Sequence, residues 1–323
     1  MTEPHPTFGR DPVPVREPSA VDRLLGQVLR GHAKLVRRRG GGGGLGRTMA
    51  LARRLRGGRG LYCVELDADS RFIFPLGDVY WTNALVRRRF DFEPDIKWLL
   101  RRATDLPYVM LDCGANMGYW SILASSAAFG RHLVVAIEAS RSTVELLANN
   151  ARANGGRFRV VHRAVGSASG KTVRLWGTRH AGRSLRHDWT SDGNAMFEEV
   201  ETISLDDAAA RYFPDGARPV LIKLDVEGVE TEALMGGHRL IGEGALVVYE
   251  DHGKDATHSA TRYVLGLGEM KIWNLDPDER LIRIENVDQL GAIKTNPITG
   301  YNFFAYRQGS PWARLFPESS PGS

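Results

Sequence analysis

The chain has 323 residues, of which 42% are hydrophobic and 25% charged, a composition typical of a soluble globular protein. No run of about 18 apolar residues occurs, and the proline-rich N-terminus lacks the apolar segment of a signal peptide, so we expect no membrane span and no signal sequence. Two cysteines, Cys63 and Cys113, are too few for a disulfide framework or a structural zinc site, which favours a reducing, cytoplasmic location.

The net charge of +5 is concentrated at the N-terminus. Residues 1–60 contain 13 Lys and Arg against 4 Asp and Glu, whereas the remainder contains 30 against 34. We expect residues 1–60 to form a basic arm, residues 61–307 the folded domain and residues 308–323 a tail. A basic arm suggests nucleic acid or a membrane as a partner. Because the body contains no nucleic-acid-binding module, we expect no nucleic acid.

Apolar residues at helical spacing predict an amphipathic helix from Val21 to Arg39, with basic residues on its other face. The five glycines at 40–44 predict a flexible linker, and a second short basic helix is expected at 49–56. Three interpretations of residues 21–60 stay open. They are a solvated or disordered extension, a helix that contacts another subunit or the body, and peripheral attachment to anionic lipid, which would place the protein at the membrane periphery.

The body is expected to begin with two strands, at 62–66 and 71–76, followed by a helix at 95–103. From Tyr108 onward, short apolar runs alternate with helices, which predicts a doubly wound α/β fold with a mostly parallel sheet. The clearest helix, 142–154, is expected to start with a capping box of Ser142 and Glu145. The expected strands are 109–111, 133–137, 158–161, 220–224 and 246–249, with further strands at 172–176, 200–204, 271–275 and 302–306.

The loop at 112–118 follows the first core strand, where open α/β sheets bind ligands. Its glycines and Asn116 permit a sharp turn and close approach to a ligand. A dinucleotide fingerprint starting at Gly114 would need glycine at positions 116 and 119, and a P-loop would need a lysine, so both patterns fail. Glu138 ends the second strand, 20 residues beyond Gly118, where it can accept hydrogen bonds from ribose hydroxyls. The loop therefore favours S-adenosylmethionine over a dinucleotide.

Three blocks of the sequence resemble FkbM-type methyltransferases. They are Leu111–Tyr119, Ala136–Glu138 with the following helix that ends at 148–154, and Ile222–Glu230; the segments Thr202–Asp207 and Phe92–Pro94 also match. The resemblance covers roughly residues 61–307. The sequence departs from the family at Ala139, where proline is common, and at Cys113, where valine is more usual.

The resemblance implies a class I methyltransferase fold, which is a Rossmann-like, mostly parallel seven-stranded sheet with helices on both faces, here preceded by an N-terminal hairpin and helix. It also implies S-adenosyl-L-methionine as cofactor and usually O-methylation of a hydroxyl, on a small molecule or glycoconjugate such as a sugar, lipid or polyketide-type natural product. An NAD(P)-dependent oxidoreductase and a non-catalytic nucleotide-binding scaffold are the alternatives. The residues expected at the cofactor are Asp112, Gly114, Ala115, Asn116, Gly118, Glu138, Ala139, Arg163, Ala164 and Asp225.

Four residues are candidates for catalysis. Lys223, Asp225 and Glu227 alternate, so they point the same way while the strand persists. They form either a structural ion pair or a site that faces the methyl group and the acceptor. His252 follows the next strand and is a candidate general base, because the pKa of histidine lies near neutrality; the alternative is a solvated loop histidine. Glu230 is expected to cap the next helix.

Two further features bear on the site. Asp225, Glu227, Glu250 and His252 offer ligands that suit magnesium or manganese, but their spacing is not diagnostic, so we expect no metal. Glu250 is also a candidate to orient the His252 ring.

The polar segment 177–199 is expected to form either a substrate lid or a surface loop. Its candidate residues are Arg179, His180, Arg183, Ser184, Arg186, His187 and Trp189.

Overall fold

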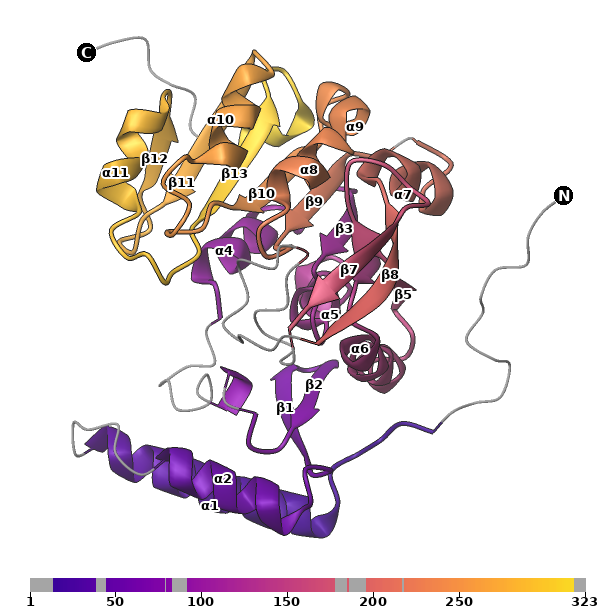
Figure 1. Cartoon of the computed structure of the whole chain (residues 1–323), viewed down its shortest axis with the longest axis vertical. Helices are drawn as coiled ribbons and strands as arrows, with labels where there is room; N and C mark the ends of the chain where they lie inside the picture. The colour runs from indigo at the N-terminus through magenta and orange to yellow at the C-terminus, as the bar shows by residue number, and fades with distance from the viewer. Residues whose placement is uncertain are drawn as a thin grey trace, which may run out of the picture.

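The structure is a computed structural model, which describes residues 14–38, 45–78, 80–82, 92–177, 185, 196–216 and 218–316. Its centre is an eight-stranded sheet in the order β12-β11-β13-β10-β9-β3-β4-β5 (Figure 1). Five neighbouring strands are parallel, namely β3 (Val109–Cys113), β4 (Leu133–Glu138), β5 (Phe158–His162), β9 (Val220–Leu224) and β10 (Leu246–Glu250). The remaining three are β13 (Asn302–Arg307), β11 (Met270–Leu275) and β12 (Leu281–Ile284), each antiparallel to its neighbour in the order.

The predicted α/β fold with a mostly parallel sheet is confirmed, with one strand more than the seven expected. The additional strand, β12, is the four-residue edge strand of a hairpin with β11. Its residues are mostly half-buried, so it lacks the continuous apolar run from which the central strands were predicted.

Helices cover both faces of the sheet, and the strand residues alternate between the two apolar clusters that result. Met110 and Leu221 face one cluster, whereas Leu111 and Ile222 face the other. The first cluster contains residues of α4 (Pro94–Arg102), α5 (Tyr119–Ala124), α6 (Arg141–Ala153) and the 3-10 helix η4 (Pro311–Leu315). The second contains residues of α7 (Leu205–Tyr212), α8 (Glu230–Met235), α9 (His238–Gly242), α10 (Ser259–Gly266) and α11 (Leu290–Ile293).

A small three-stranded sheet contacts the main sheet where β6 lies against β4. It has the order β6-β8-β7, formed by β6 (Ala164–Val165), β8 (Phe197–Ile203) and β7 (Thr172–Trp176). Two further 3-10 helices are η1 (Ala127–Phe129) and η3 (Val287–Gln289).

The start of α6 corrects one local prediction. The helix begins at Arg141, and the side chain of Ser140 accepts the backbone N–H of Thr143 as its N-cap. A capping box of Ser142 and Glu145 is therefore wrong, because the chain leaves the extended conformation two residues earlier, at Ser140.

The N-terminal helices form a layer with the first hairpin. α1 (Ala20–Arg38) and α2 (Leu45–Leu55) pack beneath β1 (Leu61–Asp67) and β2 (Ser70–Pro75), at the end of the molecule opposite α10 (Figure 1). The predicted amphipathic helix and the predicted hairpin are confirmed. No helix in the described part of the chain is long and apolar enough to cross a bilayer.

Three asparagines, Asn149 and Asn150 in α6 and Asn154 at its C-cap, attach this layer to the body. Asn149 bonds both backbone groups of Arg16, Asn150 bonds both backbone groups of Ile73, and Asn154 does the same for Arg71. Asn150 also donates to the carbonyl of Met117, in the loop that precedes α5. The three bonds of Asn150 are buried and the other four are part-buried, so the N-terminal layer is held in a defined position on the sheet.

Candidate active site

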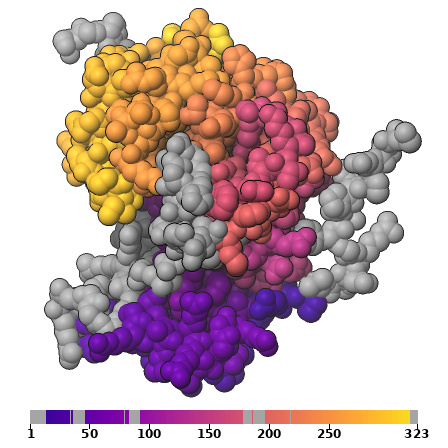
Figure 2. Space-filling view, in the orientation of Figure 1, coloured from indigo at the N-terminus to yellow at the C-terminus, as the bar shows by residue number. Residues whose placement is uncertain are grey.

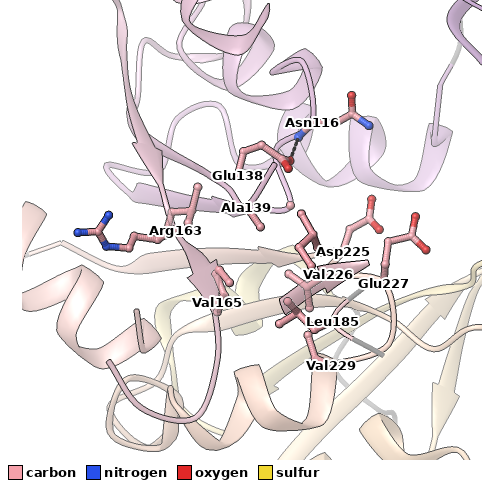
Figure 3. A pocket seen from close by; sticks show the side chains of 14 residues that line it. Asn116, Glu138, Ala139, Arg163, Val165, Leu185, Asp225, Val226, Glu227 and Val229 are labelled. Carbon is pink, nitrogen blue, oxygen red and sulfur yellow. Dashed lines mark hydrogen bonds between the residues drawn. The ribbon is translucent and has the colours of Figure 1, made fainter. Parts of the chain in front are cut away.

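A cavity opens at the carboxyl ends of β3, β4 and β9, the edge where open α/β sheets bind their ligands (Figure 3). It encloses about 580 Å³ of empty space that is open to solvent. Its lining residues are Gly114, Asn116, Ile137, Glu138, Ala139, Arg163, Ala164, Val165, Leu175, Leu185, Asp225, Val226, Glu227 and Val229.

The loop after β3 lies against the loop after β9. Gly114 has φ of 71°, and a Cβ on it would lie 1.7 Å from the carbonyl oxygen of Asp225. Only glycine combines this backbone conformation with so close an approach. Asn116 also has a positive φ, of 51°, which asparagine tolerates better than most residues. The loop that was predicted from its glycine spacing therefore forms one wall of the cavity.

Glu138 is the acidic group of that wall. Its carboxylate accepts the backbone N–H of Asn116 at 2.9 Å and that of Ser140 at 2.8 Å, and Figure 3 shows the first of these bonds. Burial raises the pKa of Glu138, while the two N–H groups act against this and favour the charged form. A carboxylate has about four acceptor positions, so two are left for a ligand.

Apolar side chains form the wall opposite, from Ala139 and from the small sheet. His162 bonds the carbonyl of Ala139 at 2.9 Å and so holds the chain after Glu138. Arg163 lines the cavity with its base, but its guanidinium binds the carbonyl of His162 and the carboxylate of Glu201. Figure 3 shows that guanidinium pointing away from Asp225.

Of the ten residues expected at the cofactor, seven line the cavity and three do not. Asp112 is buried beneath it, where its carboxylate accepts the hydroxyl of Ser121 at 2.5 Å. Ala115 is also buried, and Gly118 is the N-cap of α5, packed against Leu147. These three residues support the loop on the side that does not line the cavity.

The expected ion pair of Lys223 is confirmed. Its Nζ lies 3.2 Å from Oδ2 of Asp225, and the Lys223 side chain is only 3% exposed. The strand ends at Leu224, however, so the predicted alternation does not extend to Asp225 and Glu227, which lie in the loop after β9. Glu227 takes a positive φ of 54° there and lines the cavity together with Asp225.

Several carboxyl groups surround this lysine. Burial alone would lower the pKa of Lys223, but Asp225, Glu93 and Asp112 outweigh burial and raise it, so the ammonium group stays charged. Asp112 is the register partner of Lys223 on β3. The lysine therefore neutralises part of a buried acidic cluster.

Glu93 is a member of this cluster that the sequence did not single out as a functional residue. It precedes α4 in a left-handed conformation and accepts Nε1 of Trp120 at 2.6 Å and Nδ2 of Asn302 at 3.3 Å. Burial raises the pKa of Glu93 to about 7. The contact with Asn302 links residues 209 positions apart in the chain, so no local spacing could have indicated it.

Glu250, at the end of β10, forms a carboxyl pair with Asp225. Burial raises the pKa of Glu250 well above its ordinary value, and the carboxylates of Asp225 and Glu227 raise it further. The nearby carboxylates therefore favour the protonated form of Glu250. On its other side Glu250 contacts Gly300, where a Cβ would lie 1.8 Å from Oε1. The structure thus directs Glu250 to Asp225, not to the His252 ring it was expected to orient.

His252 lies outside the residues that line the cavity. Its Nδ1 accepts the backbone N–H of Lys254 at 3.1 Å, so the neutral ring carries its proton on Nε2. Burial and the ammonium groups of Lys254 and Lys294 lower the pKa of His252. Its role as a general base stays a prediction.

Glu230 organises the loop after β9. Its carboxylate accepts the backbone N–H groups of Val226 and Gly228, in the loop that precedes α8. The helix has no side-chain cap at Val229, so Glu230 fixes the loop and does not cap the helix as expected. Burial raises the pKa of Glu230 to about 7.

Among the described residues no group of three or more His, Cys, Asp and Glu side chains is arranged to hold a metal ion. The seven polar and aromatic residues named at 179–189 lie outside the described residues.

A second, larger groove adjoins the carboxyl pair and encloses about 2300 Å³ of empty space that is open to solvent. Glu93 and Asn302 line it, as does Gly300, which contacts Glu250. Tyr80, at its rim, has its pKa raised by burial and then by the carboxylates of Glu93 and Asp225. The remaining lining residues are Phe92, Pro94, Asp95, Asn274, Leu275, Asp276, Pro277, Glu279, Ile282, Ala292, Ile293, Thr295, Thr299 and Tyr301.

A family model described as "Methyltransferase FkbM domain" matches residues 112–266, which include the loop after β3, Glu138, the ion pair and Glu250. No curated protein sequence matches the chain significantly.

Solved structures of methyltransferases are similar at low identity. Methyltransferase FkbM from Methylobacillus flagellatus KT aligns with a TM-score of 0.40 and 18% identity, over 71% of this chain and 55% of that protein. An O-methyltransferase from Bacillus cereus, solved in complex with SAH, aligns with a TM-score of 0.38 and 11% identity, over 68% and 83%. A precorrin-6y C5,15-methyltransferase from Geobacter metallireducens GS-15 aligns with a TM-score of 0.37 and 13% identity, over 69% of this chain and 91% of that protein. This chain thus spans about half the length of the Methylobacillus protein.

Proposed function

We propose that this chain is a methyltransferase that uses S-adenosylmethionine to methylate a hydroxyl oxygen of a small molecule or glycoconjugate. A family model described as "Methyltransferase FkbM domain" matches residues 112–266, and the mostly parallel sheet carries a cavity at the carboxyl ends of its strands. The observation that carries the proposal is the position of Asp225, which lines the cavity walled by Glu138 and lies close enough to Glu93 and Tyr80, in the wall of the larger groove, to raise the pKa of both. The pocket for the methyl donor, the group that accepts the proton and the groove for the molecule to be methylated then adjoin one another.

The cavity wall suits the cofactor. The two acceptor positions left on the Glu138 carboxylate match the two hydroxyls of a ribose, and Ala139, Ala164 and Val165 offer an apolar surface for adenine. Gly114 brings the loop backbone against Asp225, so both loops border the same space.

Asp225 is the proton acceptor in this proposal. The bound cofactor supplies an electrophilic methyl group on its sulfonium. Asp225 accepts a hydrogen bond from the acceptor hydroxyl and takes its proton as the oxygen is methylated. Lys223 donates to Asp225 at 3.2 Å and holds its carboxylate in place.

The groove supplies the acceptor site. Aromatic side chains of Tyr80, Phe92 and Tyr301 suit the apolar face of a sugar or a polyketide, while Asn274 and Asn302 offer amide donors and acceptors for hydroxyls. The groove has four acidic residues and, among the described ones, no lysine or arginine. We therefore expect an uncharged or cationic acceptor.

Calorimetry of the full chain tests the donor, since S-adenosylhomocysteine should bind and NAD(P) should not. Binding of NAD(P) alone would favour the oxidoreductase and overturn the proposal.

Incubation of candidate acceptors with methyl-labelled cofactor tests turnover. Label on a hydroxyl oxygen is the expected result, label on nitrogen or carbon would reject O-methylation, and binding without any turnover across hydroxylated acceptors would favour the scaffold.

A further inference from the structure

The outer side of the N-terminal helices exposes large apolar side chains. In the described part of the chain, 12 large hydrophobic residues are exposed, and half of them lie on α1 and α2. They are 45–62% exposed. We call them the outer apolar face, which consists of Val21, Leu24, Val28 and Leu35 on α1 and Leu51 and Leu55 on α2.

These residues are not the ones that attach the helices to the body. The attachment uses Leu29 and Ala33 of α1 and Met49 and Ala52 of α2, which are buried in the main apolar cluster. Gly26 also faces inward, because a Cβ on it would lie 2.2 Å from the ring of Tyr62. Each helix therefore has one apolar side that packs on the hairpin and a second apolar side that faces away.

The exposed residues of the two helices lie beside each other. The line of contact between α1 and α2 is marked by the His32–Thr48 hydrogen bond, at 2.6 Å, and by the Arg56–Asp22 ion pair, at 2.7 Å. At about 100° of rotation per residue, the exposed positions of both helices fall next to this line, on the side away from the core. The outer apolar face is thus one continuous surface.

Positive charge borders that surface. Arg47 and Arg54 on α2 are exposed and lie four and three residues from Leu51, on the same face of the helix. Arg30 and Arg53 are also exposed, but they lie toward the body, over the ring of Tyr62 and beside Gly77. The two acidic residues in the described part of 14–60 are both neutralised, Asp22 by Arg56 and Glu17 by Arg71. An apolar stripe bordered by arginine is the composition of helices that lie in the interface of anionic membranes.

We propose that the outer apolar face binds the surface of an anionic phospholipid bilayer, with α1 and α2 parallel to the membrane plane. The apolar residues enter the headgroup boundary, and the arginines contact lipid phosphates. Figure 2 shows this helical layer at one end of the molecule, away from the orange and yellow C-terminal part of the chain. The asparagine contacts of α6 fix that orientation.

A lipid surface explains the face better than a second copy of the chain does. An isologous dimer through this face would bring two sets of arginines together, and like charges across an interface are costly. Nucleic acid would use the arginines but leave the leucines and valines unexplained.

Vesicle co-sedimentation of the full chain tests the proposal. The wild type should sediment with vesicles of equal parts phosphatidylcholine and phosphatidylglycerol, and high salt should weaken binding. The double variant Leu24→Ser/Val28→Ser should bind about tenfold more weakly, because it loses apolar surface that enters the interface. Leu133→Ser is the matched control, since Leu133 and Val28 are both 52% exposed, and it should bind as the wild type does.

Three results would overturn the proposal. The first is a wild type that stays in the supernatant with every vesicle, and the second is a double variant that binds as tightly as Leu133→Ser. The third is a wild-type dimer in light scattering without vesicles that Leu24→Ser/Val28→Ser dissociates, which would assign the face to self-association. Circular dichroism of the variants confirms folding, which is expected because the altered side chains are exposed.

Discussion

The two halves of the active site are built differently. The half at β3 and β4 consists of a turn and one carboxylate, in which Gly114, Asn116 and Glu138 are placed mainly by backbone geometry and backbone hydrogen bonds. The half at β9 and β10 consists of one ammonium group among carboxyl groups, in which Asp225 and Glu250 are placed by side-chain contacts. The first half has the shape to hold a ligand, and the second has the electrostatics to move a proton. Changes in the first should therefore affect binding, and changes in the second should affect turnover.

The largest effect is expected at Asp225. Asp225→Asn keeps the size of the side chain but removes the proton acceptor, so we expect kcat to fall about 10²–10⁴-fold. The affinity for S-adenosylhomocysteine should change much less. Steady-state kinetics and calorimetry measure the two effects, and Asp215→Asn, at an exposed site, is the control. If affinity fell as far as kcat, the division between the two halves would be wrong.

The next prediction concerns the contact between the two halves, where Gly114 lies against the backbone of Asp225. Gly114→Ala would place a Cβ 1.7 Å from the Asp225 carbonyl at φ of 71°, and we expect the free energy of unfolding to fall by about 3 kcal/mol. Gly155→Ala is the matched control, because Gly155 has φ of 70° and nothing within 4 Å of the added atom. Denaturant melts of both variants separate the clash from the backbone strain. Equal losses would show that the loops do not pack as described.

The sequence could predict the first half because its information is local. The loop at 112–118 and the strand that ends at Glu138 each lie in one short segment, where glycine spacing and an acid at a strand end are sufficient indications. For the same reason the central strands, the hairpin and the long helix were predicted close to their observed bounds.

The second half depends on contacts that span the chain. Glu93 meets Asn302, and Glu250 meets Asp225 and Gly300, through the order in which the strands assemble. Nothing in the segment Phe92–Pro94 indicates a buried carboxyl group, because its burial comes from distant parts of the chain. The loop after β9 also ended the alternation that the sequence suggested beyond Leu224. The larger groove, which these long-range contacts border, was not predicted at all.

A variant of Glu138 tests the half of the site at β3 and β4 alone, which is proposed to bind the cofactor. Glu138→Gln keeps one acceptor oxygen but loses the charge, and a hydrogen bond to a charged group contributes about 1.5–3 kcal/mol. We expect S-adenosylhomocysteine to bind about 10–100-fold more weakly, with kcat at saturating cofactor close to wild type. Calorimetry measures the first effect, and Glu145→Gln, exposed on α6, is the control. A fall in kcat at saturation would assign Glu138 to the chemistry as well.

The acidic cluster predicts a pH dependence of stability. Burial raises the pKa of Glu93 to about 7, so the folded state holds this proton more tightly than the unfolded state does. Stability should therefore fall as pH rises from about 4.5, where the unfolded group ionises, to about 7. Glu93→Gln removes this titration, so its Tm relative to wild type should increase between pH 5 and pH 8. The exposed Glu279→Gln should show no such trend, and a flat difference at Glu93 would mean that the group is not buried as described.

The smallest effect is expected at His252. Since Nδ1 accepts the N–H of Lys254, the nitrogen that remains on the neutral ring is a donor, which cannot take a proton from a hydroxyl. His252→Gln should therefore lower kcat by less than about tenfold, well below the loss expected for Asp225→Asn. Steady-state kinetics of the two variants, measured at the same saturating cofactor concentration, rank the two residues. If His252→Gln were the more severe, the proton would leave through the histidine, and the carboxyl pair would position the acceptor.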